Sequence, residues 1–236
     1  MSFCRMGVDD SDISCFYNCG GYYEVWSAEG DDHFDTAEEV IAFLRKRQSA
    51  GDKVPDYAFE EIEKWAQANK AFIEERDKEL RLRSVNSLQK KDIKNTKYSM
   101  VHTFSHMFMK QLAYESGFSV TELTEKIYFF EAEAKIGLLI HTTSGDAQCS
   151  MGGLSDLANP SKLESTIKRA LNINLTCSND PLCADSSGQG TSALSHAACF
   201  GCLMLPEICC EVRPIKNSYL DRNLLIQIND NLTPFF

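Results

Sequence analysis

The sequence has no long hydrophobic run, and this absence excludes a protein anchored by a transmembrane helix. No stretch approaches the roughly 20 consecutive apolar residues that a helix needs to span a bilayer. Residues 1–30 also lack a basic start followed by a continuous apolar stretch, so the sequence predicts no secretory signal. We therefore expect a cytoplasmic protein with no membrane partner.

Clustered positive charge is also scarce. The 236 residues include 24 Lys and Arg against 34 Asp and Glu, which gives a formal net charge of −10. The basic residues are scattered, and only Lys90-Lys91 and Lys168-Arg169 form dense spots. Because a free-standing nucleic-acid binder needs clustered Lys and Arg, the chain is a poor candidate for that class of protein.

Sequence patterns of nucleotide and acyl chemistry are missing as well. The chain contains no GxxxxGK[ST] phosphate loop, no GxGxxG and no GxSxG. Without a phosphate loop and its lysine, NTP hydrolysis by the chain alone is not expected.

What is present is the composition of an ordinary globular protein, with 43% hydrophobic and 25% charged residues. The chain is long enough for one or two domains, and its patterns divide it into three units. We expect a small hairpin-helix unit over 1–55, a charged helix and linker over 56–96, and a main domain over 97–236.

The first two units are defined by turn and capping residues. Gly20-Gly21 lies between segments rich in aromatic residues and predicts a small hairpin. Thr36 caps a predicted helix that ends at Gly51. Pro55 then opens one long charged helix over 56–83, which we interpret as a solvated helix between two units, with a coiled-coil surface as the alternative.

The main domain mixes helices with a short predicted strand. The expected elements are a helix over 98–115, a helix from Ser119 through Tyr128, a buried strand over 136–143, a tight turn or close backbone approach at Gly152-Gly153, and a helix from Asn159 to about Leu171. The predicted fold class is therefore α+β: helical with a small sheet and a cysteine-rich loop region, preceded by the hairpin-helix unit.

Cysteine is plentiful and unevenly spread, because six of the ten cysteines lie between residues 177 and 210. Without a secretory signal, clustered cysteines indicate metal ligands rather than disulfides. Cys199 and Cys202 form a CxxC pair, which can hold one tetrahedral ion from a tight turn. Cys183 upstream and Cys210 downstream can complete a Cys4 shell.

Cys177 and Cys209 are spare cysteines, so the spacing leaves the choice of ligands open. A Cys4 shell favours zinc, with an iron–sulfur cluster as its rival. A redox CxxC is less favoured, because such pairs usually begin a helix after a strand. Structural zinc takes four ligands and no water, so we expect the ion to staple a loop-rich segment.

His102 and His106 are a second candidate group. Their spacing of four places both imidazoles on one helix face. The simpler interpretation is two packed, hydrogen-bonded histidines, because no HExxH glutamate accompanies them. The alternatives are a metal site, or a hydrolase or nuclease that uses HTFSH at 102–106 with nearby acids.

Five ordered segments of the main domain resemble a known family. They are YSMVHTFSHMFMKQLAYESGFSVTELTEKIY at 98–128, GLLIHTTSGDAQCSMGGLSDLANP at 137–160, CSNDPLC at 177–183, HAACFGCLMLPEICCE at 196–211 and NSYLDRNLL at 217–225. Over residues 98–226 the chain resembles the helicase-associated zinc-binding domain of DrmB proteins from DISARM anti-phage systems. Related domains lie at the C-terminal end of DNA-repair helicases of the MrfA type.

The resemblance implies one zinc ion bound by four cysteines. By motif, Cys199 and Cys202 fall on the CxxC pair, Cys210 on the cysteine before a glutamate, and Cys183 on the second cysteine of CSNDPLC. Cys177 falls on the first cysteine of that segment and is a possible alternative ligand. In the last segment, the resemblance marks two further candidate functional residues, Asp221 and Arg222.

The function implied is that of a non-catalytic, zinc-binding accessory module. It would act with a separate helicase or nuclease partner on DNA, in phage defence or DNA repair. One alternative is a hydrolase or nuclease using His102 and His106. Another is a remnant of a longer defence protein.

Overall fold

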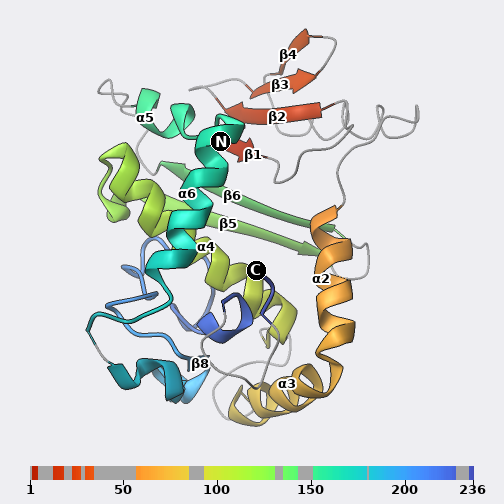
Figure 1. Cartoon of the computed structure of the whole chain (residues 1–236), viewed down its shortest axis with the longest axis vertical. Coiled ribbons are helices and arrows are strands. Elements are labelled where there is room, and N and C mark those ends of the chain that lie inside the picture. The colour runs from red at the N-terminus through yellow and green to blue at the C-terminus, as the bar shows by residue number, and fades with distance from the viewer. Residues whose placement is uncertain are drawn as a thin grey trace.

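The structure is a computed structural model, and it has the mixed α+β character that the sequence predicts (Figure 1). It describes residues 2–4, 13–18, 23–27, 30–34, 57–84, 93–130, 135–142, 151–179, 181–226 and 234–236. The predicted helix between Thr36 and Gly51 and most of the predicted linker lie outside these residues. Within them, no helix is both long and apolar enough to cross a membrane.

Six of the described strands form one antiparallel sheet in the order β4-β3-β2-β1-β6-β5. Their bounds are β1 Ser2–Cys4, β2 Ile13–Asn18, β3 Tyr23–Ser27, β4 Gly30–Phe34, β5 Leu123–Phe130 and β6 Lys135–Thr142. The antiparallel pairing of β2 with β3 confirms the predicted hairpin. β1 joins this hairpin to β5 and β6, since it pairs with β2 on one side and with β6 on the other.

Five described helices accompany the sheet. They are α2 Tyr57–Ala68, α3 Lys70–Ser84, α4 Thr96–Ser116, α5 Met151–Asp156 and α6 Pro160–Ile173. α4 packs against β5 and β6 and is crossed by α6, as Figure 1 shows. α4 and α6 confirm two predicted helices, and α6 begins as expected with Asn159 as its N-cap and Pro160 in its first turn.

The predicted single helix over 56–83 is wrong, because the chain bends between α2 and α3 at Asn69 (Figure 1). The Asn69 side-chain amide donates to the Trp65 carbonyl at 2.9 Å, beside the backbone bond from Asn69 N–H to the same oxygen. A short polar side chain that bonds the backbone in this way competes with regular helix geometry. The bend directs α3 toward the cysteine-rich part of the chain.

The predicted helix from Ser119 through Tyr128 is also wrong. Ser119 and Glu122 do form a capping box, but it caps a single 3₁₀ turn over Val120–Glu122. The chain then enters β5, which pairs with β6 along its whole length. The strand is favoured because its aromatic and β-branched residues can alternate between a helix-covered face and an open one.

Gly152-Gly153 lies inside α5 rather than in a tight turn. The predicted close backbone approach is confirmed at Gly153, where an added Cβ would lie 3.0 Å from the Ser116 carbonyl oxygen. The predicted buried strand over 136–143 corresponds to β6.

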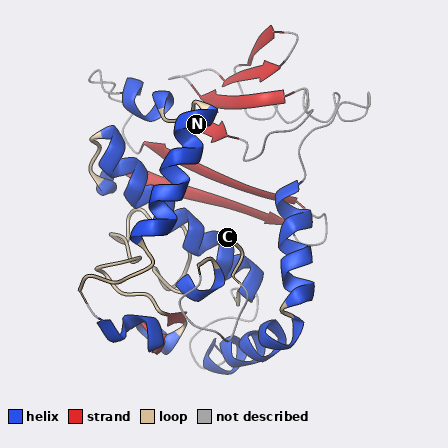
Figure 2. Cartoon of the chain, in the orientation of Figure 1, coloured by secondary structure: helices blue, strands red, loops and turns tan. Residues whose placement is uncertain are grey.

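The cysteine-rich segment is mostly loop, as the tan trace in Figure 2 shows. It holds only short pieces of regular structure: η4 Pro181–Asp185, β7 Ser187–Gln189, η5 Thr191–Ala193 and β8 Ser195–His196. A last 3₁₀ turn, η6 Arg222–Leu224, follows it. The segment still has apolar anchors, because Leu194, Leu203 and Leu205 are fully buried.

Candidate metal centres

Four cysteines from three parts of the loop region meet in one group, here named the Cys4 cluster. It consists of Cys177, Cys183, Cys199 and Cys202, whose sulfur atoms all lie within 4.8 Å of one another. Cys177 follows α6, Cys183 lies in η4, and the CxxC pair follows β8. Three segments that are separate in sequence therefore converge on one point.

The sulfur spacing in the Cys4 cluster fits a tetrahedral metal ion. The Sγ atoms of Cys177 and Cys199 are 3.4 Å apart, and Cys202 Sγ lies 3.7 Å from Cys183 Sγ and from Cys199 Sγ. Zinc bonded to four thiolates at about 2.3 Å places the sulfurs about 3.8 Å apart. A disulfide would need about 2.05 Å, so these are free thiols at the spacing of metal ligands.

The turn that carries the CxxC pair is built from backbone contacts. The Cys199 N–H donates to Cys202 Sγ at 3.2 Å. A side chain at position 201 would clash with its neighbour, because a Cβ there would lie 2.5 Å from Asn179 Cγ. Lys110 of α4 holds the turn from outside by donating to the Cys202 and Phe200 carbonyl oxygens at 2.9 and 3.2 Å.

The thiols of the Cys4 cluster differ in acidity. Burial raises the pKa of Cys183 and of Cys202. Burial also acts against ionisation of Cys199, but hydrogen bonds from the turn and from Cys177 lower its pKa to about 7. Cys199 is therefore more ready than Cys183 or Cys202 to ionise and bind a cation.

Arg222, marked by the sequence motif, lies beside this cluster as a buried structural residue. Its side chain is 0% exposed. Its Nε donates to the Ala197 carbonyl at 2.5 Å and its Nη1 to the Asn174 carbonyl at 2.7 Å. These carbonyls precede Cys199 and Cys177, so one guanidinium ties together two of the segments that carry the cysteines.

Asp221 contacts α3 instead. Its Oδ2 accepts from Arg76 Nη2 at 3.0 Å, and its Oδ1 caps η6 by accepting from the Asn223 N–H at 3.0 Å. Burial raises the pKa of Asp221 to about 6, although Arg76 opposes the shift. Asp221 thus serves to dock α3 onto the C-terminal loops.

Cys210 does not lie in the Cys4 cluster, and Cys177 takes the place that the sequence prediction gave it. The CxxC pair and Cys183 are grouped as predicted. Cys210 lies elsewhere because its backbone follows the edge of β5, where Glu211 N–H donates to Glu125 Oε1 at 3.0 Å. The spacing of the cysteines alone could not distinguish the two arrangements.

Cys210 belongs to a second group, here named the His–Glu–Cys cluster. Its members are His102, His106, Glu125 and Cys210, whose ligand atoms also lie within 4.8 Å of one another. Their exposed fractions are 0%, 0%, 2% and 1%. Both histidines are buried, as the packed interpretation predicts, but His102 Nδ1 and His106 Nε2 have no hydrogen-bond partner, so the hydrogen-bonded part of that interpretation is not confirmed.

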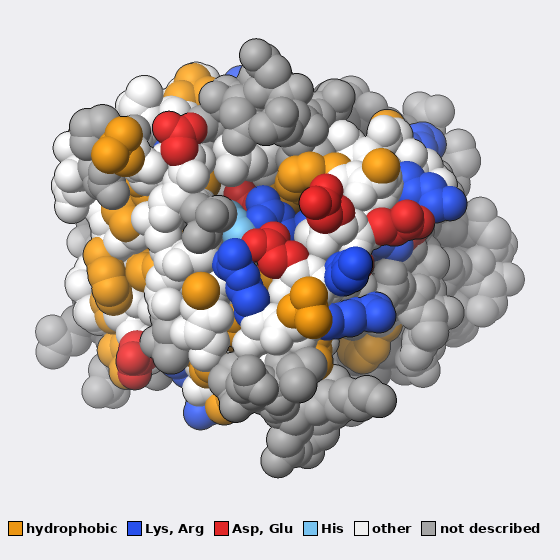
Figure 3. Space-filling view, turned by 90° about the horizontal axis from the view of Figure 1, so that it is seen from below, with side chains coloured by type: hydrophobic (Ala, Val, Ile, Leu, Met, Phe, Trp, Pro, Cys, Tyr) orange, Lys and Arg blue, Asp and Glu red, His pale blue; other side chains and the backbone are white. Residues whose placement is uncertain are grey.

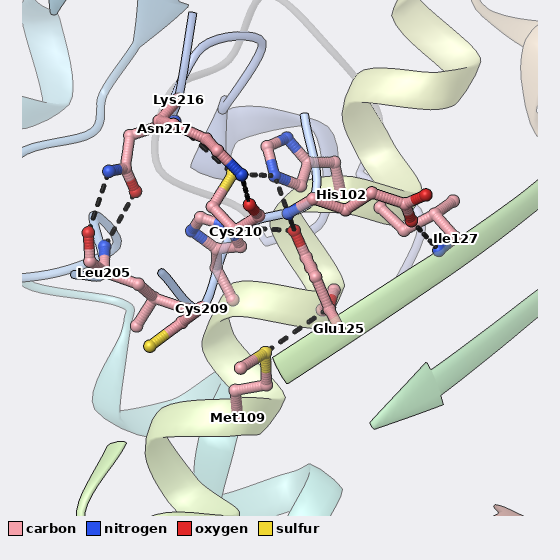
Figure 4. Close-up of polar contacts among 12 residues, drawn as sticks. His102, Met109, Glu125, Ile127, Leu205, Cys209, Cys210, Lys216 and Asn217 are labelled. Atoms are coloured by element: carbon pink, nitrogen blue, oxygen red, sulfur yellow. Dashed lines mark hydrogen bonds and ion pairs between the residues drawn. The ribbon is translucent and has the colours of Figure 1, made fainter. Parts of the chain in front are cut away.

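The contacts of the His–Glu–Cys cluster centre on one carboxylate oxygen (Figure 4). Glu125 Oε1 lies 3.2 Å from His102 Nε2 and 3.4 Å from His106 Nε2. Cys210 Sγ lies 3.4 Å from His102 Nε2. The groups come from α4, β5 and the loop after the CxxC pair.

Mutual electrostatics shift the acidity of this cluster. Burial alone would lower the pKa of His102, but the Glu125 carboxylate raises it to about 10. Burial alone would raise the pKa of Glu125, but both histidines hold it well below its usual range. The histidines likewise overcome burial at Cys210 and lower its pKa to about 6. The cluster therefore favours an ionised carboxylate and thiolate.

Sequence analysis missed Glu125, although a signal was present. In β5 the burial alternates, so that Glu125 lies on the same face as Leu123 and Ile127. A glutamate at an apolar position of an alternating strand indicates a buried, partnered charge. The signal was hidden because the segment was interpreted as a helix.

The fold and these sites define a class: an α+β module whose loop-rich half is organised around two candidate metal centres. No protein-family model matches the chain. DISARM protein DrmB from Bacillus paralicheniformis is 40% identical to it over 147 residues, which cover 62% of this chain and 25% of that protein. The chain therefore contains a DrmB-related segment, and it matches only a quarter of the length of that relative.

Proposed function

We propose that the chain is a non-catalytic, zinc-stapled accessory module that acts with a separate helicase or nuclease on DNA in anti-phage defence. The observation that carries the proposal is the 40% identity to DISARM protein DrmB. A role in DNA repair, as in helicases of the MrfA type, is a less favoured setting for the same module.

Zinc is the metal that we propose for the Cys4 cluster, with Cys177, Cys183, Cys199 and Cys202 as ligands. The four free thiols at tetrahedral spacing support this assignment. The ion would supply a cross-link among three loop segments and would balance the charge of the thiolates. A closed Cys4 shell leaves no position for substrate, which agrees with a structural role.

The partner, in this proposal, docks beside the Cys4 cluster. Tyr114 and Ile173 are 83% and 62% exposed, and both line a pocket of about 210 Å³ whose wall includes Gly201 and Cys202. The adjacent Phe200 is also exposed. Large exposed apolar side chains around a pocket favour a protein contact, and the zinc staple would fix their positions.

The test is binding to any helicase or nuclease that is encoded beside this chain, each purified separately. We expect one of them to bind the zinc-loaded chain, and the Ile173→Glu substitution to weaken that binding at least tenfold. Leu82→Glu is the matched control, since Leu82 is equally exposed but lies on α3, away from this pocket. Failure of the folded, zinc-loaded chain to bind any of these proteins would contradict the proposal.

A further inference from the structure

We infer that the His–Glu–Cys cluster is a second metal site, distinct from the Cys4 cluster, and that it holds one zinc ion in a closed N₂OS shell. The inference is independent of the partner proposed above. It rests on the spacing of the four ligand atoms, the orientation of His106, the groups around the ligands and the balance of buried charge.

The spacing is that of four ligands around one small ion. Zinc bonds of about 2.0–2.1 Å to nitrogen and oxygen at tetrahedral angles place those atoms about 3.3 Å apart. Glu125 Oε1 lies 3.2 and 3.4 Å from the two imidazole Nε2 atoms. With a zinc–sulfur bond of about 2.3 Å, sulfur and nitrogen should be about 3.6 Å apart, and Cys210 Sγ is 3.4 Å from His102 Nε2.

The orientation of His106 supports a ligand role for its Nε2. Its Nδ1 lies 3.0 Å from the Leu203 carbonyl oxygen, which can only accept, so Nδ1 carries the hydrogen. In the neutral ring Nε2 then presents a bare lone pair toward the cluster. This Nε2 is fully buried and has no hydrogen-bond partner, although Glu125 Oε1 is 3.4 Å away. Two acceptors at this distance cannot hydrogen-bond to each other, and their approach is that of two ligands of a common ion.

The groups behind three of the four ligands fit the same pattern, whereas His102 Nδ1 has no hydrogen-bond partner. Metal-binding histidines usually donate their other ring N–H to a carbonyl or carboxylate, and ligating carboxylates are themselves hydrogen-bonded. For His106, the acceptor of that ring N–H is the Leu203 carbonyl oxygen. Ser105 Oγ donates to Glu125 Oε2, and the Asn217 N–H donates to Cys210 Sγ at 3.4 Å (Figure 4).

The charge balance favours a divalent ion. The carboxylate of Glu125 and a thiolate at Cys210 carry two negative charges in a region where all four side chains are buried. One divalent cation bound by these groups displaces the proton from His102, and with two neutral imidazoles the cluster is then neutral. A donor set of imidazole, thiolate and carboxylate is typical of zinc, and the absence of exposure indicates a structural ion.

The experiment measures zinc per chain in protein purified without added chelator. We expect two zinc ions in the wild type and one in Cys210→Ser and in His106→Gln. Cys199→Ser should also retain one ion, which it loses from the other cluster. Cys209→Ser is the matched control and should keep two, because Cys209 is equally buried but its Sγ contacts the Val120 carbonyl at 3.2 Å.

X-ray absorption on the wild type keeps the test decisive even if variants fail to fold. Two filled sites should give an average of about 2.5 sulfur and about 1.5 nitrogen or oxygen ligands per zinc. One zinc per chain with sulfur-only coordination would overturn the inference. Equal zinc loss in Cys209→Ser and Cys210→Ser would overturn it as well.

Discussion

Gly201 is the residue that allows the CxxC turn to close against its neighbour. The reason is the closeness of Asn179, whose side chain occupies the place where a Cβ would lie. We predict that Gly201→Ala shifts this contact, weakens zinc retention and lowers the free energy of unfolding by about 1–3 kcal/mol. Zinc release to a colorimetric chelator during urea titration measures both effects.

Phe200→Ala provides the control for that prediction. Phe200 is adjacent in sequence, but its side chain is largely exposed, so its loss should leave zinc retention unchanged. If both variants release zinc like the wild type, the close approach of Asn179 does not constrain the turn.

The residue scale also shows how far the sequence could specify the sites. The CxxC pair and Cys183 were predictable from their spacing, since nearby cysteines must meet if they share an ion. Cys177 and Cys210 were not distinguishable, because one precedes and the other follows the CxxC pair, and spacing alone does not show which of them folds back onto it. Glu125 needed the correct strand assignment, and Arg222 needed the three-dimensional path of two carbonyl-bearing segments.

At the scale of elements, an ion pair between Arg76 and Asp221 is among the contacts that join α3 to the C-terminal loops. Arg76 joins Asp221, whose side chain is 5% exposed, and the Arg76 side chain is itself mostly buried. We predict that Arg76→Met lowers the free energy of unfolding by about 3–5 kcal/mol near neutral pH, because it leaves a buried carboxylate unpaired.

The loss should shrink as the pH falls from about 7 to about 5. The pKa of Asp221 is already raised to about 6 in the folded protein, and loss of Arg76 raises it further. When a carboxyl group has a higher pKa in the folded state than in the unfolded state, the folded state binds more protons. Lowering the pH through the folded-state pKa then stabilises the folded state. Burial lowers the pKa of His196, and Arg76 lowers that pKa further. Removal of Arg76 therefore lets His196 accept a proton more readily, which also makes the loss of stability smaller at low pH.

Thermal melts of Arg76→Met and wild type at both pH values measure this change, with the exposed Arg81→Met as control. The difference from wild type should be smaller at the lower pH for Arg76→Met and constant for Arg81→Met. A difference that grows on acidification would mean that Asp221 is not the group left unpaired.

Helices were predictable from the sequence where the helical spacing of apolar residues was clear over a long segment. α4 and α6 have clear caps and long helical patterns, and both were expected within two or three residues of their ends. β5 was missed because the capping box before it predicts a helix, whereas in the structure that box caps only a single 3₁₀ turn. The bend at Asn69 was missed because it arises from one side-chain bond to the backbone.

For the whole molecule, the distribution of charge predicts weak binding to DNA. Figure 3 shows acidic and basic side chains intermixed around a hollow on the face seen from below, rather than a patch of one sign. In α3, Arg76 and Arg83 are both paired with Glu79. With a net charge of −10, we predict micromolar or weaker affinity that falls steeply with added salt.

Fluorescence anisotropy with labelled single-stranded and duplex DNA at physiological salt measures this affinity. The affinity should rise when the partner identified by the binding test is added. Nanomolar binding by the chain alone would contradict an accessory role, since the module would then supply its own DNA-binding surface.

The position of β1 has a practical consequence for anyone who handles this chain. The strand order places Ser2–Cys4 inside the sheet, between β2 and β6, and not at its margin. Whatever is joined ahead of Ser2 must leave the molecule between two strands, where an affinity tag would compete for the main-chain groups of β6. The other end is no freer, because Phe235 packs edge-on against Trp65 and Phe236 tilts against Phe104. Fusions at either end should therefore carry a flexible spacer, so that the tag does not become part of the fold.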